Sequence, residues 1–323
     1  MSKPKVFVTR RIPDSGLDLI LADCEVDLWE HELPPTKEEL LQHVPGVDGI
    51  LSLLSDPIDM EVMQAAGENL KVISNYAVGY NNIDVQAATQ QGIAVGNTPG
   101  VLTEATADLA FALMMSAGRR LVEAEKYART GKWKTWGPST LLGVDFAGST
   151  LGIIGFGRIG RAMARRATGF GMRILFYSPS AQASMGMMKV DLDTLYRESD
   201  FISIHTPLTP ATRKMINAAA FAQMKPNAVL INTARGEVVD QDALYNALRN
   251  HKIFAAGIDV TDPEPLPPDH PLYELDNLII LPHIGSASTS TRENMALIAA
   301  SNLLAGLRRE RLPHSVNPEI YNH

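Results

Sequence analysis

The sequence predicts an α/β protein made of two doubly wound parallel sheets with helices on both faces. Short apolar runs alternate with helix-like stretches over residues 6–75, and a second series of the same kind covers residues 150–281. Strands of parallel sheets are buried on both faces by their connecting helices, so they read as continuous apolar runs. A chain of 323 residues also exceeds one ordinary core and suits two domains.

In the first series, we expect strands at residues 6–9, 25–28, 49–51 and 71–75, with helices at 13–22, 36–43 and 59–66. A long helix capped by Thr103 should follow Thr98-Pro99-Gly100. Residues 132–138, which include Trp133 and Trp136, then interrupt the pattern.

In the second series, six strands are expected at residues 150–154, 173–176, 201–205, 228–232, 254–259 and 278–281. Six strands with intervening helices make a complete doubly wound unit. A helix over residues 161–170 should follow the first of these strands, and a last helix should cover residues 289–307.

Composition excludes several classes of partner. The net charge is -7, and an acidic chain has no general attraction to nucleic acid or to anionic membranes. No apolar run reaches membrane-spanning length.

The single cysteine, Cys24, rules out an intrachain disulfide and fits a structural role in a reducing compartment. The start lacks the apolar core of a signal peptide, so we expect a cytoplasmic protein.

A glycine-rich turn indicates a dinucleotide site. Gly155-Phe156-Gly157-Arg158-Ile159-Gly160 follows an apolar strand and precedes a helix and a further strand. Gly155 permits the tight turn, Gly157 lets the backbone approach a pyrophosphate, and Gly160 lets helix and strand pack closely. The pyrophosphate would then lie at the helix N-terminus.

The choice between NAD and NADP depends on the end of the next strand. An NAD site usually has Asp or Glu there, but this chain has Tyr177-Ser178-Pro179-Ser180. Ser178 and Ser180 could donate hydrogen bonds to a 2′-phosphate, and Arg158 could supply charge. No arginine follows the strand, as it often does in a dedicated NADP site. We expect NADPH to be preferred, with NADH as the alternative.

Three polar residues follow later apolar strands. Arg235 comes after residues 228–232, Glu264 stands between two prolines, and His283 follows residues 278–281. Reduction of a keto acid needs this set: an imidazole that protonates the alkoxide, a carboxylate that favours the imidazolium, and a guanidinium that binds the substrate carboxylate.

With these motifs in place, the sequence resembles the D-isomer-specific 2-hydroxyacid dehydrogenase family over essentially its whole length. Within that family it looks most like the glyoxylate/hydroxypyruvate reductases. The resemblance is carried by residues 75–84, 97–99, 155–160, 232–240, 257–265 and 282–287. Phosphoglycerate dehydrogenases usually have an arginine where this chain has Asn75, so a phosphorylated substrate is disfavoured.

The resemblance implies roles for individual residues. His283 would be the general acid/base with Glu264 as its partner, and Asp259 and Thr233 would position the nicotinamide carboxamide. The implied substrate-binding residues are Leu54, Val78, Gly79, Trp136, Arg235 and Ser286. The implied cofactor-binding residues are Thr106, Gly155, Gly157, Arg158, Ile159, Gly160, Ser178, Ser180, Pro207, Thr212, Thr233, Ala234, Asp259, His283 and Gly285. No metal site is expected.

The resemblance also implies the domain order. A Rossmann coenzyme domain, residues 101–286, would be inserted into a flavodoxin-like substrate domain, residues 1–100 and 287–323. A homodimer is implied, because relatives send a tryptophan at the position of Trp136 into the partner's active site. From the sequence alone, Trp136 fits packing within its own chain equally well.

The function implied is NAD(P)H-dependent reduction of a small 2-keto acid, glyoxylate or hydroxypyruvate, to the D-2-hydroxy acid. One alternative keeps this chemistry but changes the substrate to D-lactate or another D-2-hydroxy acid. A second alternative is a dinucleotide-sensing corepressor-like binding protein, since such relatives keep the catalytic residues.

Overall fold

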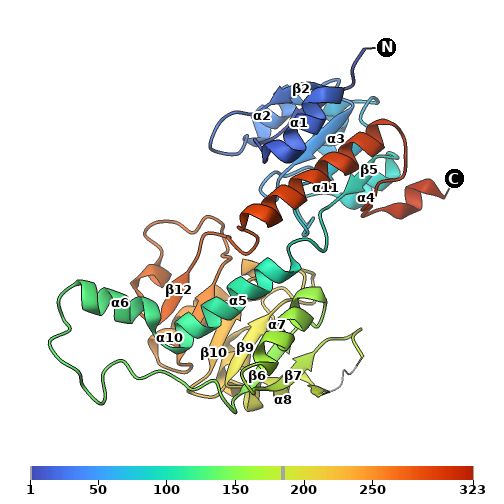
Figure 1. Cartoon of the computed structure of the whole chain (residues 1–323). Coiled ribbons are helices and arrows are strands. Elements are labelled where there is room, and N and C mark those ends of the chain that lie inside the picture. The colour runs from blue at the N-terminus through green and yellow to red at the C-terminus, as the bar shows by residue number, and fades with distance from the viewer. Residues whose placement is uncertain (1, 183–185, 323) are drawn as a thin grey trace. The chain divides into compact units, whose positions relative to one another are not determined.

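The computed structural model describes residues 2–182 and 186–322, so Met1 and His323, the ends of the expected substrate domain, lie outside the described residues. The chain forms two compact units, Met1–Leu102 with Ala287–His323, and Thr103–Ser286. Each unit has its own parallel sheet, and the chain enters the second unit and later returns to the first (Figure 1). Among the described residues, no helix is long and apolar enough to span a membrane.

The first unit contains a five-stranded parallel sheet in the order β2-β1-β3-β4-β5. This is the 2-1-3-4-5 order of flavodoxin-like folds. The strands are β1 (Lys5–Val8), β2 (Glu25–Leu28), β3 (Gly49–Ser52), β4 (Val72–Asn75) and β5 (Ala94–Gly96). The helices are α1 (Asp14–Asp23), α2 (Lys37–His43), α3 (Met60–Ala66), α4 (Val85–Gln90) and α11 (Thr289–Leu307), with a short 3-10 turn η3 (Pro318–Tyr321).

Helices cover both faces of this sheet because successive strand residues point to opposite sides. Phe7 of β1 packs in the cluster that includes Leu40 of α2 and Met63 of α3. Its neighbour Val8 packs in the cluster that includes residues of α1 and α11. The last helix approaches α1 closely where Gly16 lies, since a Cβ there would be 2.4 Å from the carbonyl oxygen of Ala296.

The second unit contains a seven-stranded parallel sheet in the order β12-β11-β10-β9-β6-β7-β8. Its strands are β6 (Thr150–Ile154), β7 (Arg173–Tyr177), β8 (Met187–Lys189), β9 (Phe201–Ile204), β10 (Val229–Asn232), β11 (Ala255–Ile258) and β12 (Leu278–Ile280). Six of them follow the 3-2-1-4-5-6 order of a Rossmann sheet, and β12 extends it.

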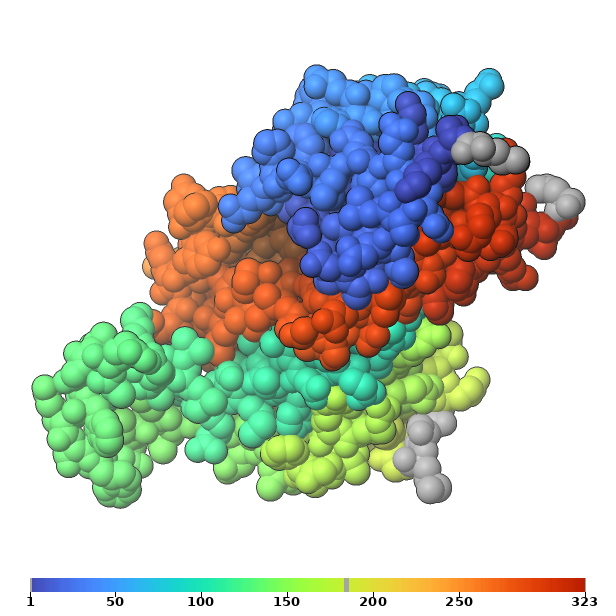
Figure 2. Space-filling view, turned by 45° about the horizontal axis from the view of Figure 1, so that its top comes forward, coloured from blue at the N-terminus to red at the C-terminus, as the bar shows by residue number. Residues whose placement is uncertain are grey.

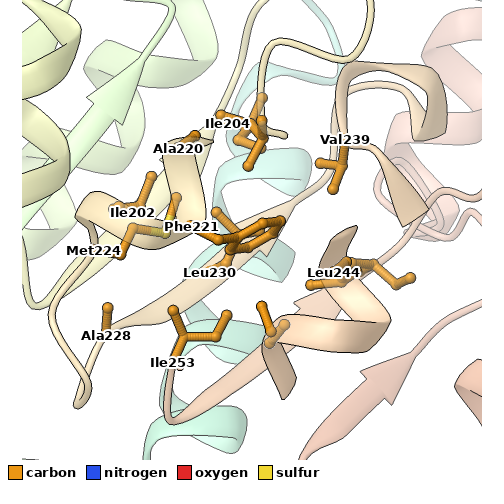
Figure 3. Packing of buried hydrophobic residues seen from close by; sticks show 14 of the residues in the cluster. Ile202, Ile204, Ala220, Phe221, Met224, Ala228, Leu230, Val239, Leu244 and Ile253 are labelled. Atoms are coloured by element: carbon orange, nitrogen blue, oxygen red, sulfur yellow. The ribbon is translucent and has the colours of Figure 1, made fainter. Parts of the chain in front are cut away.

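The helices of this unit are α5 (Thr103–Gly118), α6 (Leu121–Arg129), α7 (Arg158–Thr168), α8 (Leu192–Glu198), α9 (Ala218–Gln223) and α10 (Gln241–Arg249), with 3-10 turns η1 (Gly236–Val238) and η2 (Pro271–Glu274). One face of the sheet packs against α8, α9 and α10, where Phe221 and Leu244 meet Leu230 (Figure 3). The other face packs against α5 and α7, so that Met114 and Met163 meet Ile153.

Three sequence predictions need correction here. The first sheet has five strands, not four, because β5 (Ala94–Gly96) was not predicted, although its three residues are buried. The second sheet has seven strands, not six, because β8 was missed: it has three residues, none of them fully buried, and so no apolar run. The helix after the glycine turn begins at Arg158, not Arg161, because the turn leads directly into the helix. The last helix, residues 289–307, was predicted with its observed bounds.

The segment after α5 contributes little to the core of its unit. Helix α6 has no buried residue. Five of the large apolar side chains between residues 121 and 142 are exposed: Leu121, Val122, Trp133, Trp136 and Leu142. In Figures 1 and 2 this green segment projects from the rest of the unit. An apolar surface of this kind is typical of a region that is covered by a partner.

Candidate active site

The glycine turn between β6 and α7 has the shape that a pyrophosphate needs. Gly155 has φ +93°, and a Cβ there would lie 2.4 Å from the carbonyl oxygen of His205. A Cβ at Gly160 would lie 2.2 Å from the carbonyl oxygen of Gly155. At Gly157 a Cβ would meet nothing within 4 Å, so its surface is open at the start of α7. The backbone N–H groups of that first helical turn can therefore bind an anion.

The end of β7 is built from serines and one lysine. Ser178 is buried, and its Oγ accepts a hydrogen bond from the N–H of Ala181 (3.2 Å). Ser180 and Arg158 are exposed. Lys189, which sequence reasoning missed, donates from Nζ to the carbonyl oxygen of Ala181 (2.9 Å). It was missed because its strand, β8, was not recognised.

The three predicted catalytic residues follow three adjacent strands. Arg235 comes after β10, Glu264 after β11 and His283 after β12. Their loops therefore lie at the same carboxyl edge of the sheet, where open α/β sheets bind ligands. The structure brings two of them into direct contact: Nδ1 of His283 lies 2.5 Å from Oε1 of Glu264. This contact directs the Nε2 side of the imidazole away from the carboxylate.

Charge and burial shape this group. Burial acts to raise the pKa of Glu264, but the hydrogen bond and charge of His283, with help from Thr261 and Arg235, bring it below its usual value. Burial lowers the pKa of Arg235, while the charges of Glu264 and Glu237 oppose that shift. Glu264 and Arg235 thus each affect the pKa of the other.

The Arg235 loop is fixed by its neighbours. The amide of Asn232 donates to the carbonyl oxygen of Arg235 (2.8 Å) and accepts from the N–H of Ala234 (3.0 Å). The guanidinium donates from Nη1 to the carbonyl oxygen of Ala234 (2.7 Å). These contacts hold the guanidinium stem at the strand end.

Asp259, assigned from the resemblance to the nicotinamide carboxamide, makes contacts that the sequence did not predict. Its buried carboxylate accepts from the N–H groups of Ile284 (2.8 Å) and Gly285 (2.7 Å). The N–H of His283 donates to the carbonyl oxygen of Asp259 (2.9 Å). Asp259 therefore holds the loop that carries His283. Burial raises the pKa of this carboxyl despite the two N–H groups.

A nicotinamide dinucleotide fits the polar atoms left at this edge. Within the part of the chain that the structure describes, the buried hydroxyl of Thr233 has no hydrogen-bond partner, and so can serve a ligand. Thr106 of α5 lies close to Gly285, since a Cβ at Gly285 would be 3.5 Å from its methyl group. After β9, Thr212 donates to the carbonyl oxygen of Pro207 (2.7 Å) and shapes that loop.

His205 is a further residue of this edge that sequence reasoning missed. It follows β9, and its Nε2 lies 2.8 Å from Oγ of Ser203. Burial lowers its pKa to about 4, so it is neutral at physiological pH. The available signal was a polar residue at a strand end, the same signal that identified His283.

The predicted substrate residues of the first unit lie on two loops, and two asparagines tether the loop that carries Val78 and Gly79. The amide of Asn75 donates to the carbonyl oxygen of Gly79 (2.9 Å), and that of Asn97 donates to the carbonyl oxygen of Val78 (2.8 Å). The loop at Leu54 follows β3, and Leu54 itself is exposed. These amide contacts fix the backbone whose N–H groups were assigned to the substrate carboxylate.

Trp136 lies in neither core. Its side chain is 80% exposed, so the interpretation of Trp136 as ordinary packing within its own chain is wrong. Ser286, the last residue of the second unit, follows Gly285 in the loop held by Asp259.

An open glycine turn on a Rossmann sheet, with a His–Glu pair and an arginine at the same edge, defines a dinucleotide-dependent oxidoreductase. Comparison with known proteins identifies the family. Residues 111–285 match the NAD binding domain of the D-isomer specific 2-hydroxyacid dehydrogenases, and the chain belongs to that family. Its cofactor is accordingly a nicotinamide dinucleotide.

Relatives match over nearly the whole chain. A glyoxylate reductase from Korarchaeum cryptofilum is 53% identical, covering 98% of this chain and 97% of that protein. A crystal structure of a Thermus thermophilus protein is 48% identical with a TM-score of 0.92, covering 97% of this chain and 99% of that one. The NADPH-dependent glyoxylate/hydroxypyruvate reductase from Sinorhizobium meliloti, in complex with NADP and malonate, is 33% identical with a TM-score of 0.87 over 98% of both chains.

Proposed function

We propose that this chain reduces glyoxylate or hydroxypyruvate to the corresponding D-2-hydroxy acid, with NADPH as the preferred cofactor. The observation that carries the proposal is the 2.5 Å contact of His283 with Glu264 at the sheet edge that also carries Arg235 and the glycine turn. The names of the Korarchaeum and Sinorhizobium relatives support the substrate class.

A bound nicotinamide supplies the hydride that reduces the carbonyl carbon of the substrate. His283 supplies the proton: with Nδ1 held by Glu264, the proton on Nε2 passes to the carbonyl oxygen as it becomes an alkoxide. One hydride and one proton convert the keto acid to the hydroxy acid. Glu264, whose pKa lies below its usual value, stays ionised and stabilises the imidazolium before the transfer.

Arg235 binds the substrate carboxylate, because a guanidinium can donate two parallel hydrogen bonds to it. Partial burial of Arg235 strengthens its attraction for the carboxylate, because water screens the pair less. The guanidinium also polarises the carbonyl that accepts the hydride.

The preference for NADPH rests on the end of β7, where Ser178 and Ser180 stand in place of an acid. An acid there would repel a 2′-phosphate and bind the ribose hydroxyls of NAD instead. We expect Ser178→Asp to shift the preference from NADPH toward NADH. An unchanged preference in that variant would remove Ser178 from the 2′-phosphate site.

A homodimer is the proposed assembly. The exposed apolar surface of residues 121–142, with Trp136 at 80% exposure, needs a cover that its own unit does not provide. A second copy of the chain is the occupant implied by the family. We also propose a cytoplasmic location, since the single cysteine, Cys24, is a free buried thiol and fits a reducing compartment.

The test is the loss of reduced-nicotinamide absorbance when NADPH or NADH is combined with glyoxylate, hydroxypyruvate or pyruvate. The variant to compare is His283→Asn, because His283 has φ +54° and asparagine tolerates this conformation better than alanine. We expect about 10²–10⁴-fold slower reduction with cofactor binding retained. The matched control is His31→Ala, at an exposed histidine of the first unit.

Fast NADPH oxidation with glyoxylate or hydroxypyruvate supports the substrate and cofactor. Turnover with pyruvate alone would instead favour a D-lactate dehydrogenase. Negligible turnover with every pair, despite cofactor binding, would favour a dinucleotide-sensing protein. Unchanged turnover in His283→Asn would refute the role given to this imidazole.

A further inference from the structure

Lys189 lies beside the loop that decides cofactor choice in a Rossmann unit. It is the last residue of the edge strand β8, paired in register with Phe176 of β7. From there its side chain reaches over the loop that follows β7. Its Nζ donates to the carbonyl oxygens of Pro179 (3.3 Å) and Ala181 (2.9 Å). The ammonium group therefore lies at the loop where the adenosine ribose is recognised.

These contacts leave the charge of Lys189 able to act on a ligand. Both acceptors are neutral carbonyl groups, so they orient the ammonium without cancelling its charge. An ammonium has three donors, and these contacts use two of them. The residue is exposed, so an approaching phosphate oxygen can reach the third.

The same loop presents a second donor. Oγ of Ser178 accepts from the N–H of Ala181, which holds the hydroxyl oxygen and leaves its hydrogen to donate. Ala181 thus links the two groups, since its N–H contacts Ser178 and its carbonyl oxygen contacts Lys189. A hydroxyl and an ammonium that both contact Ala181 suit a phosphate monoester better than a ribose diol, which an acid would bind.

We propose that Lys189 binds the 2′-phosphate of NADPH and supplies the positive charge that the sequence did not show after β7. The proposal rests on the NADPH preference proposed above and names the residue responsible for it. Lys189 comes from the neighbouring strand, so it replaces the arginine that often follows β7 in NADP sites. A lysine serves here as a point charge, without the bidentate geometry of arginine.

The experiment is a fluorescence titration of the full-length protein with NADPH and with NADH, for the wild type and for Lys189→Met. Methionine keeps the length and apolar stem of the side chain and removes its charge. We expect the Kd for NADPH to rise about tenfold, as for loss of one charge-assisted hydrogen bond at an exposed site. The Kd for NADH should stay unchanged. Lys189→Arg should retain NADPH binding.

Two controls make the result specific. Lys252→Met removes an exposed lysine just before β11, which lies four strands away from β7 in the same sheet, and should change neither Kd. Competition by 2′,5′-ADP, which carries the 2′-phosphate but no nicotinamide, should weaken in Lys189→Met to the same extent as NADPH. The difference between wild type and variant should shrink as salt is raised, because the site is exposed.

Equal loss of NADPH and NADH binding in Lys189→Met would overturn the proposal, since it would mean that the lysine only shapes the loop. Unchanged binding of both would overturn it as well. A wild type that prefers NADH would refute the proposed cofactor preference alone. In that event, a selective loss of NADPH and 2′,5′-ADP binding in the variant would still support the contact with Lys189.

Discussion

Replacement of Asp259 by asparagine tests how the catalytic imidazole is held. The carboxylate of Asp259 accepts from the N–H groups of Ile284 and Gly285 at 2.8 and 2.7 Å, and both belong to the loop that carries His283. Asparagine has the same shape but only one acceptor oxygen. Its amide nitrogen would face one of the two N–H groups, so one hydrogen bond is lost and a donor meets a donor.

The magnitude follows from these contacts. A hydrogen bond to a charged group is worth about 1.5–3 kcal/mol, and asparagine loses one of the two. Part of that loss is offset, because burial raises the pKa of Asp259 and the neutral amide avoids the cost of burying a charge. A net cost of about 2 kcal/mol corresponds to roughly thirtyfold in an equilibrium constant. We therefore expect kcat for reduction to fall by up to about thirtyfold.

The assay compares kcat and the urea midpoint of Asp259→Asn with those of the wild type. The matched control is Asp262→Asn, three residues further along and exposed, which should change neither quantity. A lower kcat with a small change in midpoint would show that the loop is displaced locally. If Asp259→Asn retained wild-type kcat and midpoint, the hydrogen bonds to Ile284 and Gly285 would not be what positions His283.

Three further predictions concern other parts of the molecule. In Glu264→Gln, kcat for reduction should fall, because the imidazole of His283 loses the carboxylate that holds its Nδ1 at 2.5 Å, and an unchanged kcat would refute the pair. In the wild type the pKa of Glu264 lies below its usual value, so protonation of Glu264 should lower the rate only in acid. Gly160→Ala should lower the thermal midpoint and weaken cofactor binding, because its Cβ would lie 2.2 Å from the carbonyl oxygen of Gly155, and an unchanged melting curve would contradict the close packing. Trp136→Ala should weaken self-association in sedimentation, and a wild type that sediments as a monomer would refute the proposed homodimer.

The sequence predicted the strands of four or five residues and missed two shorter strands, β5 and β8. Strand β6 was predicted at Thr150–Ile154, as observed, because all five of its residues are buried. Strand β8 has three residues and no fully buried one, so it exists only through its register with β7. Missing β8 also meant missing Lys189. An edge strand of this kind has no periodic signal that sequence analysis can use.

In the candidate site, too, the sequence predicted some features and missed others. Arg235, Glu264 and His283 were singled out because each is a polar residue after an apolar run, and parallel strands bring such residues to one edge. The hydrogen bonds of Asp259 could not be predicted in this way. They depend on the exact course of the loop after β12, which turns back so that two successive N–H groups point at one carboxylate.

The backbone of His283 indicates why that loop needs a carboxylate. Its φ is +54°, in the left-handed region that non-glycine residues seldom adopt. Two other such residues, His251 and Arg309, follow the C-caps of α10 and α11, where a left-handed residue commonly ends a helix. His283 follows a strand, so no helix end accounts for it. Strain of this kind persists where surrounding contacts enforce it, and here the enforcing group is Asp259. The left-handed backbone of His283 and the buried carboxylate of Asp259 therefore act together to fix the direction of the imidazole.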